Sequence, residues 1–202
     1  MLTPSRRVSG FSLIELMVTI SLIAALLTLG VPAFGKWAAD AGTRGTAEQL
    51  ATALRLAQTT AITHNRTTMF ALTDAVPAYN AKAVANGSNW FISLQPSALS
   101  GETASSSDLI QAVTFARQNR VSLTGPAVVC FDALGQQVPV SDTLTGLSAP
   151  CKLPDGDSGG LFSYTVSRLD ATRQFKVLVY RGGRIRMCDV AKKLADAPDG
   201  CP

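Results

Sequence analysis

The sequence predicts an α+β protein in which one long N-terminal helix packs on a C-terminal antiparallel β-sheet, and two observations carry this prediction. Residues 11–65 are first apolar and then amphipathic, with apolar positions three and four residues apart, which is the period of one helix face. From residue 66 onward, short runs rich in β-branched and aromatic residues alternate with turn residues, as in antiparallel sheets. We therefore expect a basic leader at 1–10, an apolar half-helix at 11–32, an amphipathic half-helix at 33–65 and a globular β-rich domain at 66–202.

The apolar half-helix is long enough to cross a membrane. Phe11 to Val31 comprises 21 residues. At about 1.5 Å per residue, such a helix spans the roughly 30 Å hydrocarbon core of a bilayer. Glu15 is the one charged residue of this run. An ionised carboxylate at the bilayer centre would cost about 2.5 to 3.5 kcal/mol, whereas near the end of the span it stays close to the polar interface. An acid kept at this position indicates a function.

The amphipathic half-helix has one face suited to packing on a sheet. Pro32 lacks an N–H donor and crowds the preceding turn, so we expect the helix to bend there and to continue. Small and apolar residues that let a sheet approach closely recur beyond it, namely Ala47, Leu50, Leu54, Ala57 and Ala61. The opposite side is expected to be solvent-exposed surface rather than a site, and it carries Glu48, Gln49, Arg55 and Gln58.

The β-rich domain contains several short apolar runs separated by turn residues. The predicted strands lie at 67–72, 90–94, 112–116, 121–125, 127–138, 162–169 and 175–188. Two connecting segments, 75–89 and 97–108, are rich in Ala, Gly, Asn and Ser and offer little material for a core. We expect both segments to be mobile surface loops.

The N-terminus reverses the order of an ordinary secretory signal. The basic leader ends at Gly10, ahead of the apolar run, so cleavage there would leave the hydrophobic helix on the mature protein. The stretch GFSLIELMVTISLIA resembles the class III leader and first helix of type IV pilins and type II secretion pseudopilins. The resemblance implies that prepilin peptidase cleaves between Gly10 and Phe11 and methylates the new N-terminus. It also implies that Glu15 pairs with the N-terminal amine of a neighbouring subunit, since a buried charge is tolerable when paired.

Later motifs resemble the FimT/GspH branch of the same family. The helix ends in LAQTTAITHNRTTMF, Trp90 opens a strand, and VVCFDALGQQV and GRIRMC follow. The resemblance implies a minor pilin or minor pseudopilin with its helix laid against a β-sandwich-like domain. It further implies a single-pass inner-membrane precursor with a periplasmic domain, assembled with other pilins into an extracellular pilus.

Four cysteines, Cys130, Cys151, Cys188 and Cys201, suit a domain in an oxidising periplasm. Three pairings are possible, and we favour Cys130 with Cys151 and Cys188 with Cys201 because each pair is close in sequence. By the chain-entropy estimate, the second bond would contribute about 3 kcal/mol and hold the C-terminal tail. No C-x-x-C spacing occurs, and His64 is the only histidine, so a zinc site is not expected.

Residues 156–160, GDSGG, reproduce the nucleophile region of trypsin-like serine proteases. That chemistry needs a histidine base held by a buried aspartate, and His64 lies at a predicted helix end. Asp155 and Asp157 lack the remaining ligands of a calcium loop, and the sequence has no phosphate-binding glycine loop. We therefore expect a turn-rich loop here, and neither an enzyme, a metal site nor a cofactor.

Positive charge is concentrated at the C-terminal end. Residues 11–164 hold eight Lys or Arg against ten Asp or Glu, whereas residues 165–202 hold eight against four, a net charge of +4. Alternation along a strand would place Arg184 and Arg186 on one face and Ile185 on the other. Two strand residues span about 6.6 Å, close to the spacing of successive phosphates, and a guanidinium binds a phosphate with two hydrogen bonds.

The GRIR stretch resembles the GRxR signature of FimT proteins that bind DNA during natural transformation, and Gly183, Arg184 and Arg186 match it. The resemblance implies non-specific DNA binding in DNA uptake by competent cells, with Arg181, Lys192 and Lys193 as secondary contacts. The alternative is a purely structural minor pilin, or a GspH-like pseudopilin of type II secretion, in which these arginines are solvated residues of an edge strand.

The function assigned to Glu15 is directly testable. Glu15→Ala or Glu15→Val is expected to leave membrane insertion intact, because it removes a charge from an apolar run. Incorporation into filaments should fall, because the neighbouring N-terminal amine no longer has its partner. Membrane fractionation and the amount of the variant in sheared filaments measure the two effects, and normal incorporation would refute the assignment.

Overall fold

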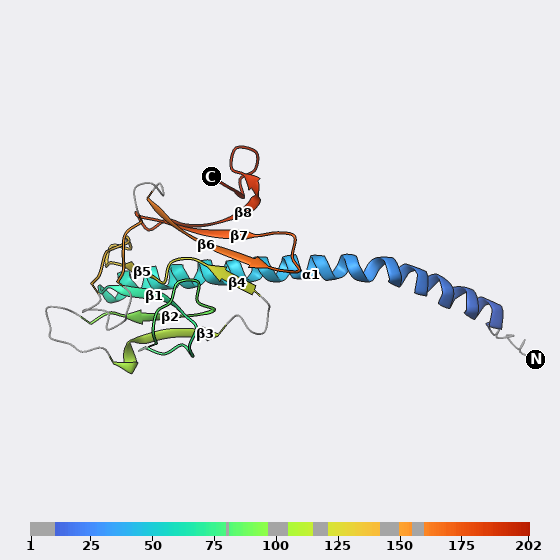
Figure 1. Cartoon of the computed structure of the whole chain (residues 1–202), viewed down its shortest axis with the longest axis horizontal. Coiled ribbons are helices and arrows are strands. Elements are labelled where there is room, and N and C mark those ends of the chain that lie inside the picture. Colours follow the sequence, from blue (N-terminus) through green and yellow to red (C-terminus); the bar gives the residue numbers. More distant parts are fainter. Residues whose placement is uncertain (1–10, 80, 97–104, 115–120, 142–149, 155–159) are drawn as a thin grey trace, which may run out of the picture. The chain divides into compact units, whose positions relative to one another are not determined.

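The computed structural model describes residues 11–79, 81–96, 105–114, 121–141, 150–154 and 160–202 (Figure 1). Within these ranges, residues 29–33 and 106 are described by their backbone alone. The chain divides into two compact units, Met1–Ala38 and Ala39–Pro202. One helix, α1 (Leu13–His64), belongs to both units. It passes through Pro32 without ending, and the bend expected there stays a prediction.

The first half of α1 carries large apolar side chains on its surface. Leu13, Ile14 and Leu26 are each at least 70% exposed. Glu15 lies in the first turn of the helix, where the helix dipole favours a negative charge. Within the described part of the chain, no helix has both the length and the hydropathy needed to span a bilayer.

The second half of α1 forms the centre of the globular unit, running between two sheets (Figure 1). The five apolar positions predicted for its packing face are all completely buried. Three of the five are alanines, whose short side chains allow close approach, so one helix face packs against both sheets in a single core.

Sheet A contains four antiparallel strands in the order β3-β2-β1-β5. They are β1 (Thr68–Thr73), β2 (Asn89–Leu94), β3 (Leu109–Thr114) and β5 (Val128–Phe131), with the short 3-10 helix η1 (Ser106–Asp108) before β3. β1 and β2 are buried along their whole length because both faces of the sheet are covered. Phe70 and Ile92 pack in the core with α1, whereas Met69 and Phe91 belong to a second apolar cluster.

Sheet B contains five strands in the order β4-β6-β7-β8-β9. They are β4 (Val121–Thr124), β6 (Leu161–Arg168), β7 (Phe175–Tyr180), β8 (Ile185–Lys193) and β9 (Gly200–Cys201). All neighbours are antiparallel except β9, which runs parallel to β8 and is not predicted by the sequence. The predicted fold class is confirmed.

The predicted strand at 127–138 is too long, because a turn interrupts it after Phe131. The carboxylate of Asp132 accepts hydrogen bonds from the backbone N–H groups of Leu134 and Gln136, both at 2.9 Å. Gly135 adopts a φ of +76°, a conformation that glycine takes without strain. We call residues 132–136 the Asp132 turn.

The expectation that segment 75–89 contributes little to a core is wrong. Ala81 and Ala83 are buried, and they pack in the second apolar cluster with Met69 and Phe91. Small side chains suffice here because the loop lies directly on the sheet, where Val84 N–H donates to Leu72 O at 2.8 Å. Of the other predicted loop, 97–108, residues 97–104 lie outside the described residues.

Two disulfides tie the globular unit, and they are the pairs favoured from the sequence. Cys130 of β5 is bonded to Cys151, within the second apolar cluster, and Cys188 of β8 is bonded to Cys201 of β9. The second bond fixes the chain segment after β8, which we call the tail (residues 194–202), to the edge of sheet B.

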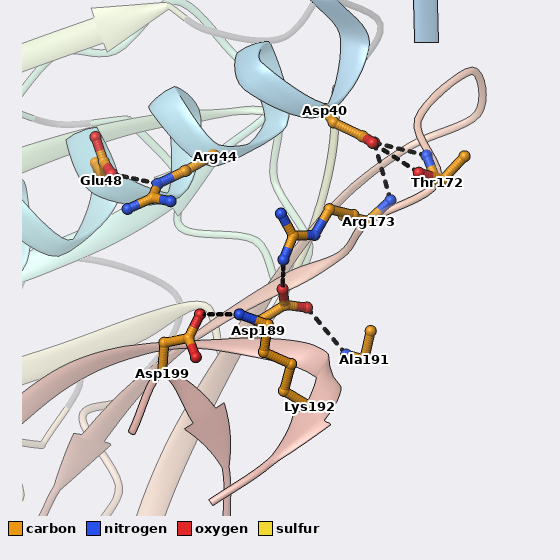
Figure 2. A network of polar contacts seen from close by, with 9 residues as sticks. All are labelled: Asp40, Arg44, Glu48, Thr172, Arg173, Asp189, Ala191, Lys192 and Asp199. Atoms are coloured by element: carbon orange, nitrogen blue, oxygen red, sulfur yellow. Dashed lines mark hydrogen bonds and ion pairs between the residues drawn. The ribbon is translucent and has the colours of Figure 1, made fainter. Parts of the chain in front are cut away.

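A polar network joins α1 to the loop between β6 and β7 (Figure 2). The carboxylate of Asp40 accepts hydrogen bonds from the backbone N–H groups of Thr172 and Arg173, at 2.7 and 3.0 Å, and from the Thr172 hydroxyl at 2.6 Å. Arg173 also forms an ion pair with Asp189, which is only 1% exposed. The hydroxyl of Thr172, more than the two backbone donors, lowers the pKa of Asp40.

This network predicts a stability difference that depends on pH. The pKa of Asp40 is lower in the folded protein than its ordinary value. The ionised carboxylate therefore contributes fully to the free energy of unfolding at a pH above the ordinary pKa, and this contribution is lost as the pH falls through the folded-state pKa. Asp40→Asn should therefore destabilise the protein near neutral pH, and the difference from wild type should narrow in acid. Urea unfolding at a series of pH values measures this. Thr172→Val should reduce the same pH dependence, and a difference that stays constant with pH would contradict the assignment.

Candidate nucleic-acid interface

The candidate site is a tight turn at one end of sheet B. Residues 181–184, Arg-Gly-Gly-Arg, connect β7 to β8, and we call them the basic turn. Tyr180 N–H donates to Arg184 O at 2.9 Å, and Gly183 N–H donates to Tyr180 O at 2.8 Å, which closes the turn. Gly183 has a φ of +84°, a backbone conformation that residues with a Cβ rarely adopt.

Both arginines of the basic turn are exposed. The guanidinium of Arg184 lies 4.1 Å from the centre of the Tyr180 ring, a distance at which the ring attracts a cation. A contact with the aromatic face does not consume the N–H donors of the guanidinium. Arg184 can therefore rest on Tyr180 and still bind an anion.

Arg186 has a different set of partners. Its Nη2 donates to the carbonyl oxygens of Pro198, at 2.7 Å, and Gly200, at 3.0 Å, so this side chain holds the tail. Ile185 packs against the core, as the predicted alternation requires. The two arginines of the GRIR stretch therefore differ: Arg184 lies in the basic turn against Tyr180, whereas Arg186 lies in β8 and binds carbonyl groups of the tail.

The two lysines also differ. Lys192 Nζ donates to the Asp199 carboxylate at 2.6 Å, which lowers the pKa of Asp199. Lys193 is exposed at the end of β8. The structure therefore brings Arg181 and Arg184 together on the basic turn, and it places Arg186 and Lys192 against the tail.

Gly183 is required by the protein itself. A Cβ at this position would lie 2.0 Å from the carbonyl oxygen of Gly135, so the basic turn and the Asp132 turn touch through their backbones. The prediction that Gln58 belongs to a solvent-exposed face is wrong, because its Nε2 donates to Gly135 O at 2.7 Å and to Gly183 O at 2.8 Å. Arg55, one turn earlier on α1, reaches Ile185 O at 3.4 Å.

The residues predicted for processing and assembly lie at the other end of the chain. Gly10 is outside the described residues, Phe11 is 80% exposed, and Glu15 is exposed in the first turn of α1. Most of the GDSGG stretch is also outside the described residues. Where the structure describes side chains, no group of three or more His, Cys, Asp or Glu is placed to hold a metal ion.

Two family models match the chain. Residues 46–183 match the family described as type II transport protein GspH, and residues 5–31 match the prokaryotic N-terminal methylation motif. No curated protein sequence matches this chain. Two crystal structures of the type IV minor pilin FimU of Pseudomonas aeruginosa strain PAO1 are similar, at 14% and 13% identity with TM-scores of 0.44 and 0.45. Each match covers 79% of this chain, and 99% and 94% of the respective FimU chains.

A methylation motif that leads into the long helix of an α+β domain defines the class of type IV pilins and pseudopilins. The GspH model matches more than half of the chain, so the protein belongs to the GspH family. It is a minor pilin or pseudopilin of the GspH and FimT kind, which is a structural protein and not an enzyme. Membership implies assembly with other pilins and processing by prepilin peptidase.

The two glycines of the basic turn provide a matched pair of variants. Gly183→Ala should destabilise the protein by about 1 to 3 kcal/mol, because the added Cβ meets a backbone oxygen and the positive φ is unfavourable for alanine. Gly182→Ala should have little effect, since nothing lies within 4 Å of the added Cβ. Thermal unfolding of both variants measures the difference, and equal stability would contradict the contact between the two turns.

Proposed function

We propose that this protein is a minor type IV pilin that binds DNA without sequence preference through its basic turn, as a step in DNA uptake during natural transformation. The observation that carries the proposal is the pair of exposed arginines, Arg181 and Arg184, on a turn whose backbone is held from several sides. A guanidinium group binds a phosphate with two hydrogen bonds, and it does not distinguish bases when the contact is to the nucleic-acid backbone.

The rigidity of the turn supports this function. Arg181 N–H donates to Gly160 O at 3.0 Å, and Arg181 O accepts a hydrogen bond from Gln137 N–H at 3.0 Å. The side chain of Arg181 therefore projects from a fixed backbone. Binding of a ligand to such a turn costs the protein less conformational entropy than binding to a loop that becomes ordered only in the complex.

The surrounding charge also supports a polyanionic partner. Residues 165–202 carry a net charge of +4, and clustered cations raise the local concentration of polyanions. In this proposal Arg184 and Arg181 make the principal phosphate contacts. Arg186 adds a contact through its remaining nitrogen donors, and Gly183 shapes the turn. Lys193 and, after release from Asp199, Lys192 extend the contact along β8.

The route to the filament is part of the same proposal. Prepilin peptidase cleaves between Gly10 and Phe11, and the precursor waits in the inner membrane with residues 11–32 as its single span and residues 66–202 in the periplasm. Glu15 then pairs with the N-terminal amine of a neighbouring pilin as the subunit enters the filament. The match of residues 5–31 to the methylation motif supports these steps.

A purely structural subunit of a pilus, or of a type II secretion pseudopilus, is the second candidate. The contacts of Arg186 with the tail carbonyls and of Lys192 with Asp199 favour it, because they give two of the predicted DNA-binding residues a role in holding the tail. This alternative assigns no ligand to the basic turn.

Removing both arginines of the basic turn separates the two candidates. Arg181→Gln/Arg184→Gln should bind a DNA duplex at least about tenfold more weakly at low salt, and the slope of log affinity against log salt should fall by roughly 0.9 for each phosphate that the variant no longer neutralises. Fluorescence polarisation of a labelled duplex, titrated with the full chain in a neutral detergent, measures both quantities.

The control is a double variant that removes the same charge elsewhere. Lys82 and Lys152 are exposed, and their neighbours in sequence pack with sheet A in the second apolar cluster. The basic turn belongs to sheet B. Lys82→Gln/Lys152→Gln should therefore bind nearly as well as wild type. Equal weakening in both double variants would show a general charge effect. Undiminished binding in the arginine variant would leave the structural candidate.

A further inference from the structure

Three elements that are far apart in the sequence meet at one side-chain amide. Gln58 of α1 donates one hydrogen bond to Gly135 O in the Asp132 turn, at 2.7 Å, and another to Gly183 O in the basic turn, at 2.8 Å. Gly135 and Gly183 are both buried. A primary amide has two N–H donors, so these two carbonyls use the full donor capacity of Gln58.

The contact with Gly183 controls more than the stability of the turn. The carbonyl of Gly183 and the N–H of Arg184 belong to the same planar peptide unit. A hydrogen bond that fixes this carbonyl therefore fixes the orientation of the peptide that leads into Arg184. It also sets the direction in which the Arg184 side chain leaves the backbone, toward the Tyr180 ring 4.1 Å away.

We propose that Gln58 is the positioning residue of the basic turn, and that it holds Arg184 in the conformation that binds phosphate. The inference rests on the proposed function for its ligand, but the positioning itself concerns only the protein. Gln58 acts through the backbone of Gly183 and does not touch the nucleic acid.

The chemistry of the contact defines informative substitutions. Gln58→Leu removes both donors at similar size, and Gln58→Glu places a carboxylate against two carbonyl oxygens. Gln58→Lys keeps an N–H donor at the end of the side chain and should restore the contact. Gln49→Leu makes the same change on an exposed position of the same helix and serves as the control.

The first measurement does not involve DNA. In the full chain in neutral-detergent micelles, Gln58→Leu and Gln58→Glu should speed hydrogen exchange of the Gly183 amide, which closes the turn on Tyr180 O. Both variants should also reduce the ring-current shift of the Arg184 side-chain protons over Tyr180, with Tyr180→Leu as the reference for its complete absence. Gln58→Lys and Gln49→Leu should keep both signals. Unchanged exchange and ring-current shift in the Leu and Glu variants would overturn the proposal.

The second measurement is the affinity for a labelled DNA duplex in the same detergent. Gln58→Leu and Gln58→Glu should bind roughly tenfold more weakly. Loss of the donors to two buried carbonyls destabilises the ordered turn, and the apparent affinity falls with the fraction of molecules in which the turn keeps its binding conformation. Circular dichroism confirms that each variant is folded. Wild-type affinity in folded variants with a released turn would overturn the proposal. A wild-type chain that does not bind DNA would instead overturn the proposed function, and the exchange and ring-current measurements would then decide the positioning of the turn on their own.

Discussion

One apolar face of α1 determines how the globular unit is built. The residues on this face are mostly alanine and leucine, and they are buried against both sheets in one core. Since burial of apolar surface is the main favourable term in folding, the two sheets are held together through the helix between them and through direct contact, as between Phe70 of β1 and Tyr164 of β6, whose ring centres lie 5.8 Å apart. At roughly 25 cal/mol for each Å² of apolar surface removed from water, a face of this kind outweighs any single polar contact of the unit.

Polar contacts at the border of that face then decide where the loops lie. Asp40 holds the loop between β6 and β7, and Gln58 holds two turns at once. Both residues use side-chain atoms to satisfy backbone groups that would otherwise be left without partners at the ends of strands. The core therefore fixes the sheets, and the helix border fixes the turns that carry the candidate site.

The fold class could be predicted because two sequence patterns are clear: the helical spacing of apolar residues up to residue 65, and the short runs of β-branched and aromatic residues after it. The spacing of Ala47, Leu50, Leu54, Ala57 and Ala61 identified the buried helix face, and the short apolar runs identified most strands. The short parallel strand β9 was not predictable, because two residues carry no period and their pairing depends on contacts distant in sequence. The loop 75–89 was misjudged because small alanines serve as core residues when a loop lies flat on a sheet.

The candidate site was only partly predictable for a related reason. Charge and composition pointed to Arg184 and Arg186, but the partners of each arginine depend on tertiary structure, and Arg186 binds carbonyls of the tail. The position of Gln58 in the helix carried a signal of its own. It lies four residues after Leu54 and three before Ala61, so it borders the buried face instead of opposing it. A long polar side chain in such a position can reach the backbone of a neighbouring element.

The tail has a consequence for crowded assemblies of subunits. β9 occupies part of the outer edge of sheet B, where Asp189 N–H donates to Asp199 O at 2.8 Å and Leu194 N–H donates to Cys201 O at 2.9 Å. The disulfide between Cys188 and Cys201 keeps it there. Backbone groups that are already satisfied offer no template for strand exchange between molecules. Along this stretch, subunits at high local concentration are protected from edge-to-edge aggregation by their own C-terminal residues.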